Sequence, residues 1–174
     1  MRLRLLRFPC LCLMLALAAP ARAALGENEA RAAVVYHLTL FAEWPPGSLR
    51  EGHFNLCVLT ENENSAHALA HLNGKTVKGA RLVIWRKHPM QDLGACQAVY
   101  LSEMSDPLRD HVINKLAGLP VLTIANGDIP VPGAMISLGV AGERVYFDID
   151  LSVVQRVGLR LDAKLLRLAR SIAK

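Results

Sequence analysis

Apolar and polar positions in the first half of the chain alternate between helical spacing and short continuous apolar runs. From about residue 28 to residue 44 the apolar residues form one broad helical stripe, which Pro45-Pro46-Gly47 ends because proline lacks an amide donor. The run HFNLCVLT (53–60) predicts a strand buried on both faces. A helix from about 62 to 72 is expected next, followed by one or two strands in KTVKGARLVIWRK.

The second half continues the alternation and ends with two predicted helices. The expected elements are a strand at 98–104, a helix from 105 to about 116, a strand at 120–125, strands at 134–140 and 144–150, and helices at 151–157 and 163–173. Gly142 is expected to join the two late strands as a hairpin, and Asp162 is the expected N-cap of the last helix.

This order of elements predicts an α/β fold. Strands that alternate with helices favour a mostly parallel sheet with helices on both faces, and the late hairpin makes the sheet mixed. The sequence has no internal repeat, low-complexity segment or change of composition that would mark a linker. We therefore expect a single-domain sandwich over residues 24–174.

The first 23 residues have the features of a cleavable signal peptide. Three arginines precede an apolar run from Phe8 to Ala19, and Ala21-Arg22-Ala23 places small residues where a signal peptidase reads. The run is shorter than the roughly 20 residues of a membrane-spanning helix, so cleavage before Ala24 is favoured over an uncleaved anchor. An exported, periplasmic chain follows from this prediction.

Cleavage changes the charge of the chain. The full sequence has 20 Lys and Arg against 15 Asp and Glu, but four of these basic residues and none of the acidic ones lie in residues 1–23. The mature chain would carry a net charge of about +1, so its composition gives little reason to expect nucleic acid as a partner.

Only Cys57 and Cys96 remain after cleavage. An even pair in an oxidising compartment favours one disulfide, with two buried free thiols as the alternative. Each lies beside an apolar run, so bonding requires that the two predicted strands be neighbours.

The candidates for chemistry each have a structural alternative. His67 and His71 are four residues apart, as in a metal pair, but they have no nearby third ligand, so we expect solvated side chains and no metal site. Asp148 and Asp150 would share one face of a strand, where they could serve acid–base chemistry or bind a cation. We prefer the alternative that they are the solvent side of the strand and the cap of the next helix.

Motifs of hydrolases, nucleotide-binding loops and metalloproteases are absent from the sequence, and we predict neither an enzyme nor a cofactor. The predicted helix 163–173 is amphipathic and basic, which suits a membrane surface or, as we prefer, packing on the sheet.

The mature chain resembles the YfiR family, exported bacterial proteins long catalogued as a domain of unknown function. RAAVVYHLTLFAEWP is similar to the family's Ala-rich helix closing in Phe-x-x-Trp-Pro, here Phe41, Trp44 and Pro45. LCVLT, LNGKTVKGARLVIWR, GACQAVYL, LAGLPVLTIAN and RVYFDIDLSVVQRVGLRLDAKLLRLAR continue the resemblance in order.

The resemblance implies that the protein is a regulator rather than an enzyme. The family's namesake represses an inner-membrane diguanylate cyclase by binding its periplasmic sensor region, and it thereby controls cyclic-di-GMP and biofilm formation. It also implies a homodimer and a disulfide between Cys57 and Cys96. The namesake's second cysteine pair has no counterpart here, and Asp148 and Asp150 stand where relatives often carry Phe-Glu-x-Asn.

Two further expectations concern binding surfaces. We expect Phe41 to be buried and Trp44 to be the contact with a membrane signalling partner. The alternative function is a periplasmic small-molecule sensor, whose ligand would enter at the carboxyl ends of the strands near residues 126–133 and the Trp44-Pro45-Pro46 corner. An envelope hydrolase is the third candidate, for which the sequence shows no nucleophile and for which Asp148 and Asp150 would be the best catalytic candidates.

Overall fold

The computed structural model describes residues 26–49, 52–142 and 144–174, so the predicted signal peptide lies outside the described residues. The helices are α1 (Glu27–Phe41), α2 (Glu63–Ala70), α3 (Asp106–Leu116), α4 (Leu151–Arg156) and α5 (Ala163–Leu168). The strands are β1 (Ala42–Glu43), β2 (His53–Thr60), β3 (Thr76–Val77), β4 (Ala80–Arg86), β5 (Ala98–Ser102), β6 (Leu122–Asn126), β7 (Ile136–Ala141), β8 (Arg144–Asp150), β9 (Arg160–Leu161) and β10 (Ser171–Ala173).

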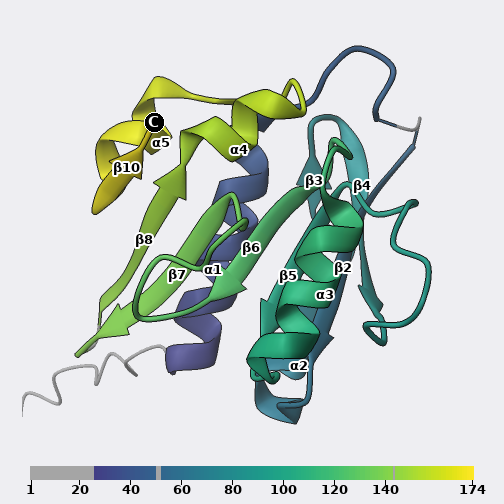
Figure 1. Ribbon diagram of the computed structural model, residues 1–174. Helices are drawn as coiled ribbons and strands as arrows, with labels where there is room; N and C mark the ends of the chain where they lie inside the picture. Colours follow the sequence, from purple (N-terminus) through teal and green to yellow (C-terminus); the bar gives the residue numbers. More distant parts are fainter. Residues whose placement is uncertain (1–25, 50–51, 143) are drawn as a thin grey trace, which may run out of the picture.

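Eight strands form one mixed sheet in the order β10-β8-β7-β6-β5-β2-β4-β3 (Figure 1). The five central strands β4, β2, β5, β6 and β7 are parallel, whereas β3 and β8 are antiparallel to their neighbours. The predicted α/β fold, with its mostly parallel sheet and late β7–β8 hairpin, is therefore confirmed.

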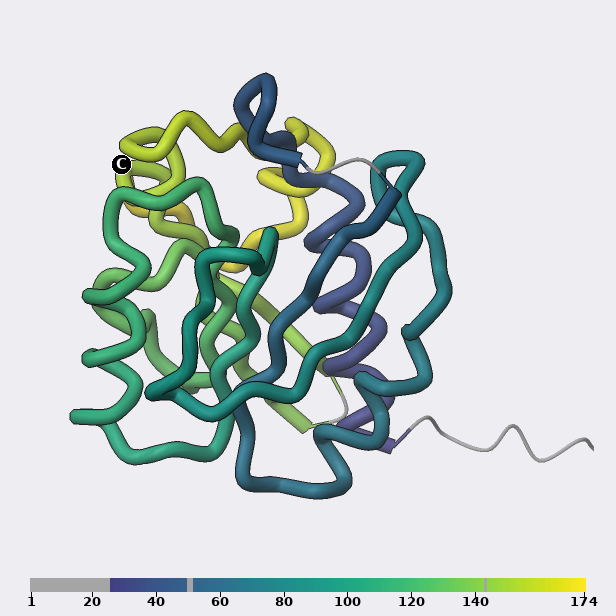
Figure 2. The backbone as a smooth tube through the Cα atoms, turned by 90° about the vertical axis from the view of Figure 1, so that its right-hand side faces the viewer, coloured from purple at the N-terminus to yellow at the C-terminus, as the bar shows by residue number. Residues whose placement is uncertain are grey.

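Helices cover both faces of the sheet, as predicted. Figure 2 shows the sheet between α1 on one side and α3 on the other. One buried cluster joins α1, α2 and α5 to the sheet, and a second cluster lies under α3 and contains both cysteines. We call these two sides of the sheet the α1 face and the α3 face.

Local sequence explains several element boundaries. The side chain of Asn62 accepts hydrogen bonds from Asn64 N and Ser65 N and so caps α2. Lys78 and Gly79 both have positive φ, 50° and 79°, which is the conformation of the tight turn that joins β3 to β4. Asp162 caps α5, as predicted, by accepting a hydrogen bond from Lys164 N.

The first helix ends earlier than predicted. It stops at Phe41, because Ala42 and Glu43 pair with Leu161 and Arg160 as the two-stranded ribbon β1–β9. The backbone N–H and C=O groups of Ala42 and Glu43 are thus bonded by residues about 120 positions later in the chain. The spacing of apolar residues along 28–44 gives no sign of this pairing.

The predicted helix 163–173 is wrong in its second half. Helix α5 ends at Leu168, the backbone turns extended at Ala169, and Ser171–Ala173 forms the edge strand β10 parallel to β8. The backbone N–H of Arg170 donates to Phe147 O at 2.8 Å, which begins this pairing. The open edge of β8 thus takes the segment that helical spacing assigns to a basic amphipathic helix.

An ion pair holds β10 in place. Asp148, only 2 % exposed, accepts hydrogen bonds from Arg170 Nε at 2.9 Å and from Ser171 Oγ at 2.6 Å. A second guanidinium nitrogen of Arg170 also donates to the carboxylate. The expectation that Asp148 lies on a solvated face of the strand is therefore wrong, because a cation from the last segment covers it.

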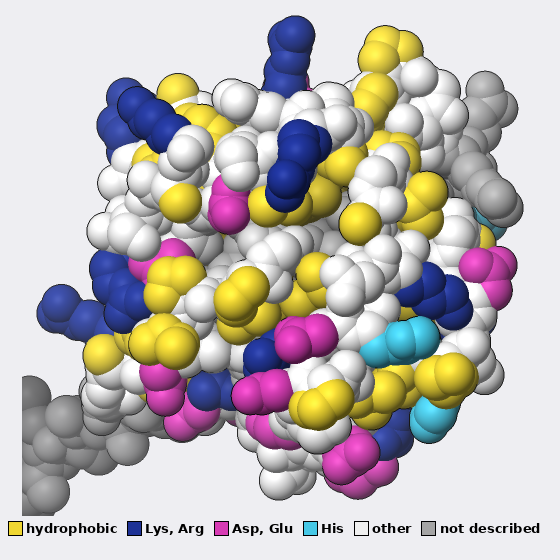
Figure 3. Space-filling model, viewed as in Figure 1, with side chains coloured by type: hydrophobic (Ala, Val, Ile, Leu, Met, Phe, Trp, Pro, Cys, Tyr) yellow, Lys and Arg dark blue, Asp and Glu magenta, His cyan; other side chains and the backbone are white. Residues whose placement is uncertain are grey.

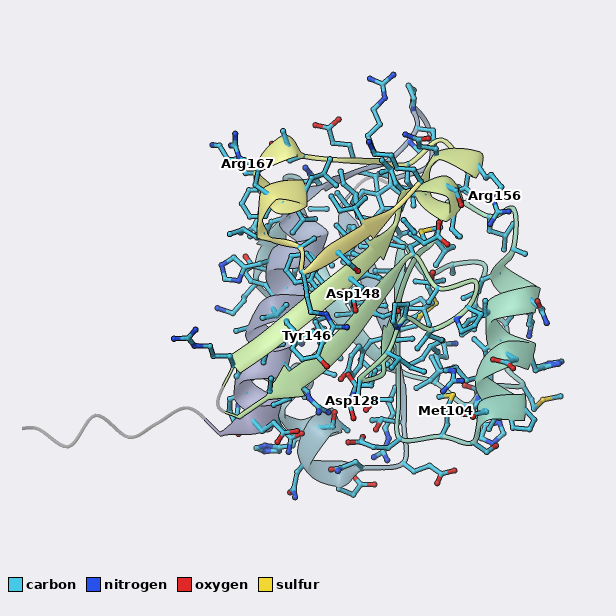
Figure 4. All side chains as sticks on the ribbon, turned by 60° about the vertical axis from the view of Figure 1, so that its left-hand side comes forward. Met104, Asp128, Tyr146, Asp148, Arg156 and Arg167 are labelled. Atoms are coloured by element: carbon cyan, nitrogen blue, oxygen red, sulfur yellow. A yellow bond between two sulfur atoms is a disulfide. The ribbon has the colours of Figure 1, made fainter. Side chains whose placement is uncertain are left out.

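Tyr146 supports this ion pair from beside it. The guanidinium carbon of Arg170 lies 3.9 Å from the centre of the Tyr146 ring, and both side chains donate a hydrogen bond to the backbone oxygen of Asp128. Figure 4 labels Tyr146 between Asp148 and Asp128. A Cβ atom on Gly139, which pairs with Tyr146 across the hairpin, would lie 2.4 Å from the ring. Glycine at position 139 is therefore what allows the ring to lie there.

We expect Arg170→Met to lower the free energy of unfolding by about 3 kcal/mol, because it leaves the buried Asp148 carboxylate without its cation. Asp148→Asn is expected to cost only about 1–2 kcal/mol, since the half-exposed Arg170 can turn to water. Urea unfolding followed by circular dichroism measures both. An equal loss in the two variants would contradict this account.

The Asp148–Arg170 ion pair should make the free energy of unfolding depend on pH. Hydrogen bonds from Arg170 are the main cause that lowers the pKa of Asp148 below its ordinary value. The native state therefore holds this proton less tightly than the unfolded chain, and the contribution is complete above about pH 4 and lost as the pH falls through the folded-state pKa. Unfolding free energies of the wild type and Asp148→Asn should converge as the pH falls below about 4, and a constant difference would refute the assignment.

Candidate functional site

The Trp44 corner, Trp44-Pro45-Pro46, lies at the amino ends of the central strands. The indole Nε1 of Trp44 donates to Gln97 O at 3.1 Å, and its ring meets the Phe54 ring edge-on with centroids 5.1 Å apart. Pro45 lies against Gly158, where a Cβ would approach Pro45 Cγ to 3.1 Å. The corner therefore joins the end of α1 to the starts of β2 and β5 and to the end of α4.

Gln97 connects this corner to the sheet. Its backbone N–H donates to Asn55 O at 2.9 Å, and its side-chain Oε1 accepts from Asn55 N at 2.7 Å. Its carbonyl accepts from Leu122 N as well as from Trp44. Gln97 and Asn55 are both buried, so each bond replaces water at an otherwise unsatisfied polar group.

The disulfide lies next to Gln97 on the α3 face. Cys57 in β2 and Cys96, two residues before β5, are bonded with Cα atoms 5.8 Å apart. Strands β2 and β5 are adjacent and parallel, which meets the condition set by the sequence, and both cysteines are buried. The predicted disulfide is confirmed, and the alternative of two free thiols is wrong.

The three aromatic residues of the first segment are all half-buried. Tyr36, Phe41 and Trp44 pack against the core cluster of the α1 face while keeping part of their surface exposed. Phe41 is thus less buried than expected. The indole N–H of Trp44 already has a backbone partner, so the surface that remains for another protein is apolar.

The expected crevice is wrong where it includes Trp44. Phe54 and Gln97 stand at the beginnings of β2 and β5, so Trp44 lies at the amino ends of these parallel strands and not at their carboxyl ends. The 127–133 loop follows the carboxyl end of β6, and Pro130, Val131 and Pro132 line a separate hollow of about 200 Å³ beside Asp148.

The candidates for chemistry have structural partners. Asp150 accepts from Val153 N and from Ser152 Oγ, so it caps α4, as the alternative interpretation predicts. His67 and His71 are exposed with ring centroids 4.5 Å apart. Among residues 26–49, 52–142 and 144–174 no group of three His, Cys, Asp or Glu side chains is placed to hold a metal ion.

Within those same ranges, every helix is too short or too polar to cross a membrane. Helix α5 has only six residues, of which Leu165 is buried and Leu168 is 71 % exposed. The apolar stripe predicted for 163–173 therefore does not exist as one face.

Sequence reasoning missed Gln97 and Asn55. They are polar residues inside or beside apolar runs, which is the pattern of a buried hydrogen-bonded pair, but the sequence does not say which backbone groups they satisfy.

Comparison with known protein families shows to which family the chain belongs. The sequence profile described as YfiR/HmsC-like matches residues 28–170 of the 174-residue chain. The chain belongs to the YfiR/HmsC-like family. Its members are periplasmic regulatory proteins associated with diguanylate cyclase signalling and are not known as enzymes. A disulfide fits an oxidising compartment of this kind.

The match spans the segments described above. It begins in α1, includes the Trp44 corner and both cysteines, and ends at Arg170, the cation that holds β10. The resemblance noted from the sequence is thus confirmed as family membership.

We expect the disulfide of this YfiR-like chain to contribute about 4 kcal/mol to the free energy of unfolding, because it closes a loop between residues 39 apart in the unfolded chain. Urea unfolding with and without dithiothreitol measures this contribution. The Cys57→Ala/Cys96→Ala variant should be less stable by a similar amount and insensitive to dithiothreitol. A wild-type protein with unchanged stability after confirmed reduction would contradict the expectation.

Proposed function

We propose that this YfiR-like protein is a periplasmic, non-enzymatic regulator that binds the periplasmic part of an inner-membrane signalling protein and represses a diguanylate cyclase. The observation that carries the proposal is the family match over residues 28–170. Export by a signal peptide in residues 1–23 is part of the proposal. Repression of the cyclase would limit cyclic-di-GMP and biofilm formation.

Repression requires differential affinity. A binding protein shifts a two-state partner only by the difference in its affinity for the two states, so this chain must bind the inactive state of the cyclase more tightly. The rigid sheet, with its central strands joined by a disulfide, supports such a role because it presents a fixed surface.

The decisive experiment removes the gene and measures cyclic-di-GMP. We expect cyclic-di-GMP and biofilm to rise in the deletion strain and to fall again when the exported protein is supplied on a plasmid. In-cell crosslinking followed by purification should recover an inner-membrane protein. Unchanged cyclic-di-GMP together with no membrane partner would reject the proposal.

We propose the Trp44 corner as part of the surface that contacts this partner. It is half-exposed, apolar and held from behind by Gln97 and Phe54, so a partner would meet a preformed surface. Changing Trp44 itself does not isolate the contact, because Trp44→Ala also removes a hydrogen bond and a ring packed on the core.

Pro46→Glu separates the two roles. Pro46 is exposed beside Trp44, so a glutamate there should change the melting temperature little while placing a charge on the proposed contact surface. We expect repression of cyclic-di-GMP to fall at unchanged protein level. Ala70→Glu is the matched control, since Ala70 is an exposed residue of α2 outside the Trp44 corner, and it should keep full repression.

Full repression by the Pro46→Glu variant would show that the Trp44 corner is not part of the contact surface. It would not contradict the proposed regulatory role.

The proposal also includes a homodimer, as family resemblance implies. Analytical ultracentrifugation of the mature chain should give a mass near twice that of one chain, and a monomer across the micromolar range would reject this part.

A further inference from the structure

A second candidate site lies at the opposite end of the sheet from the Trp44 corner. A cavity of about 500 Å³ opens at the carboxyl ends of β2 and β4 and beside the first turn of α3. The residues that line it include Leu59, Thr60, Arg86, Lys87, Met104 and Leu108. Volumes of this size are typical of sites for small molecules. Met104 is labelled in Figure 4 below α3, well away from Asp148.

The position of the cavity follows from the topology. The chain leaves β2 through α2 on the α1 face and goes to β4, whereas it leaves β5 through α3 on the other face and goes to β6. Adjacent strands whose connections leave in opposite directions open a crevice beyond their carboxyl ends, which is where ligands bind in open α/β sheets.

The wall formed by the β4–β5 loop is ordered before any ligand arrives. Pro89 and Leu93 are buried, Lys115 Nζ of α3 donates to Gln91 O at 2.8 Å, and the disulfide fixes the loop's end at Cys96. Because this loop is already ordered, it loses little further conformational entropy when a ligand binds.

A polar network around Glu103 lies next to the cavity and shares Thr60 with its lining. Glu103 has a φ of 49°, unusual for a residue with a side chain. Its carboxylate accepts hydrogen bonds from Thr60 Oγ1 at 2.8 Å, Ser102 Oγ at 2.6 Å and Asn62 Nδ2 at 3.3 Å. Because these bonds occupy the carboxylate, Glu103 orients the ends of β2 and β5 and is not itself free to bind a cation.

The charges that face the cavity favour one anionic group. Arg86 is neutralised by two hydrogen bonds to Glu63. Lys87 lies over the Trp85 ring at 5.1 Å, and no carboxylate among the described residues lies within ion-pair distance of it. Lys87 is thus the one Lys or Arg side chain lining the cavity that is available to a ligand, and Glu61 and His88 line the cavity as well.

Three apolar side chains, Leu59, Met104 and Leu108, line the side of the cavity toward α3. Leu59 is fully buried, and Met104 and Leu108 are half-buried on the side of α3. Figure 3 shows apolar and histidine side chains together on this part of the α3 face. An apolar floor beside one available cation fits a molecule with an apolar body and a single negative charge.

We infer that this cavity binds small organic anions that consist of an apolar ring or short chain and one carboxylate or sulfonate. Lys87 holds the charged group, and Leu59, Met104 and Leu108 contact the apolar body. The inference concerns the purified protein alone and stands whether or not the proposed cyclase partner exists.

Two fluorescent probes that differ in charge test this site on the full mature chain. 1-Anilinonaphthalene-8-sulfonate carries the anion, and N-phenyl-1-naphthylamine has the same ring system without it. We expect Lys87→Gln to raise the Kd of the sulfonate about fivefold to tenfold and to change that of the neutral probe less than about twofold. Lys75→Gln is the matched control, because Lys75 lies over Tyr36 in a similar way outside the cavity, and it should change neither.

Met104→Trp, which fills the cavity, should weaken both probes. Amide chemical-shift changes on binding should map to residues 59–61, 86–91 and 104–108. Octanoate and benzoate, added as competitors, distinguish an acyl chain from an aromatic ring as the preferred body.

Sulfonate binding that is equal in the wild type and Lys87→Gln, or shifts that map elsewhere, would overturn the inference. Failure of both competitors to displace the sulfonate would do the same.

Discussion

The pairing of β2 with β5 is the constraint on which the rest of the structure depends. Every residue of β2 after His53 is buried, and β4 and β5 flank it on either side. The chain must therefore pass from β4 across β2 to reach β5, and in residues 87–97 it does so without a helix. A crossing without a helix lacks a ladder of backbone hydrogen bonds, so the buried Leu93, the Cys57–Cys96 bond and the Gln97–Asn55 hydrogen bonds fix it. Both act at the same place, where the loop ends and β5 begins.

Two surfaces arise from this arrangement at opposite ends of the same strands. At the amino ends, Gln97 offers its carbonyl to Trp44 and so fixes the corner that follows α1. At the carboxyl ends, the diverging connections through α2 and α3 leave the crevice beside Lys87. The disulfide supports both, because it sets the position of Gln97 on one side and of the β4–β5 loop on the other. A ligand at one end and a protein at the other would act on one rigid element.

The C-terminal segment is held to the sheet by a different kind of interaction. β8 would have an exposed edge after the hairpin, and a strand of three residues covers part of it. Its apolar content is small, so the Asp148–Arg170 ion pair and the Tyr146 ring supply much of what holds it. Gly139 is required on the neighbouring strand because the ring occupies the space of a side chain there. Polar contacts thus attach the last strand, whereas apolar burial attaches the central ones.

The sequence by itself determined the order of the central elements, the mostly parallel sheet and the family. Buried strands such as 53–60 and capped helices such as 63–70 leave local signals, because burial on both faces and free helix ends select particular residues in or beside the segment. It also indicated the disulfide, since residues 24–174 contain two cysteines, which admit one pairing.

Only the tertiary structure decided the end of α1 at Phe41, the strand at 171–173, the burial of Asp148 and the separation of Trp44 from the carboxyl-end crevice. Each depends on a partner distant in sequence: Leu161 for Ala42, Phe147 and Asp148 for Arg170, Gln97 for Trp44. A local pattern records the preference of a segment for helix or strand. It carries no information about which distant group will satisfy a backbone amide or a charge, and that group determines the final conformation.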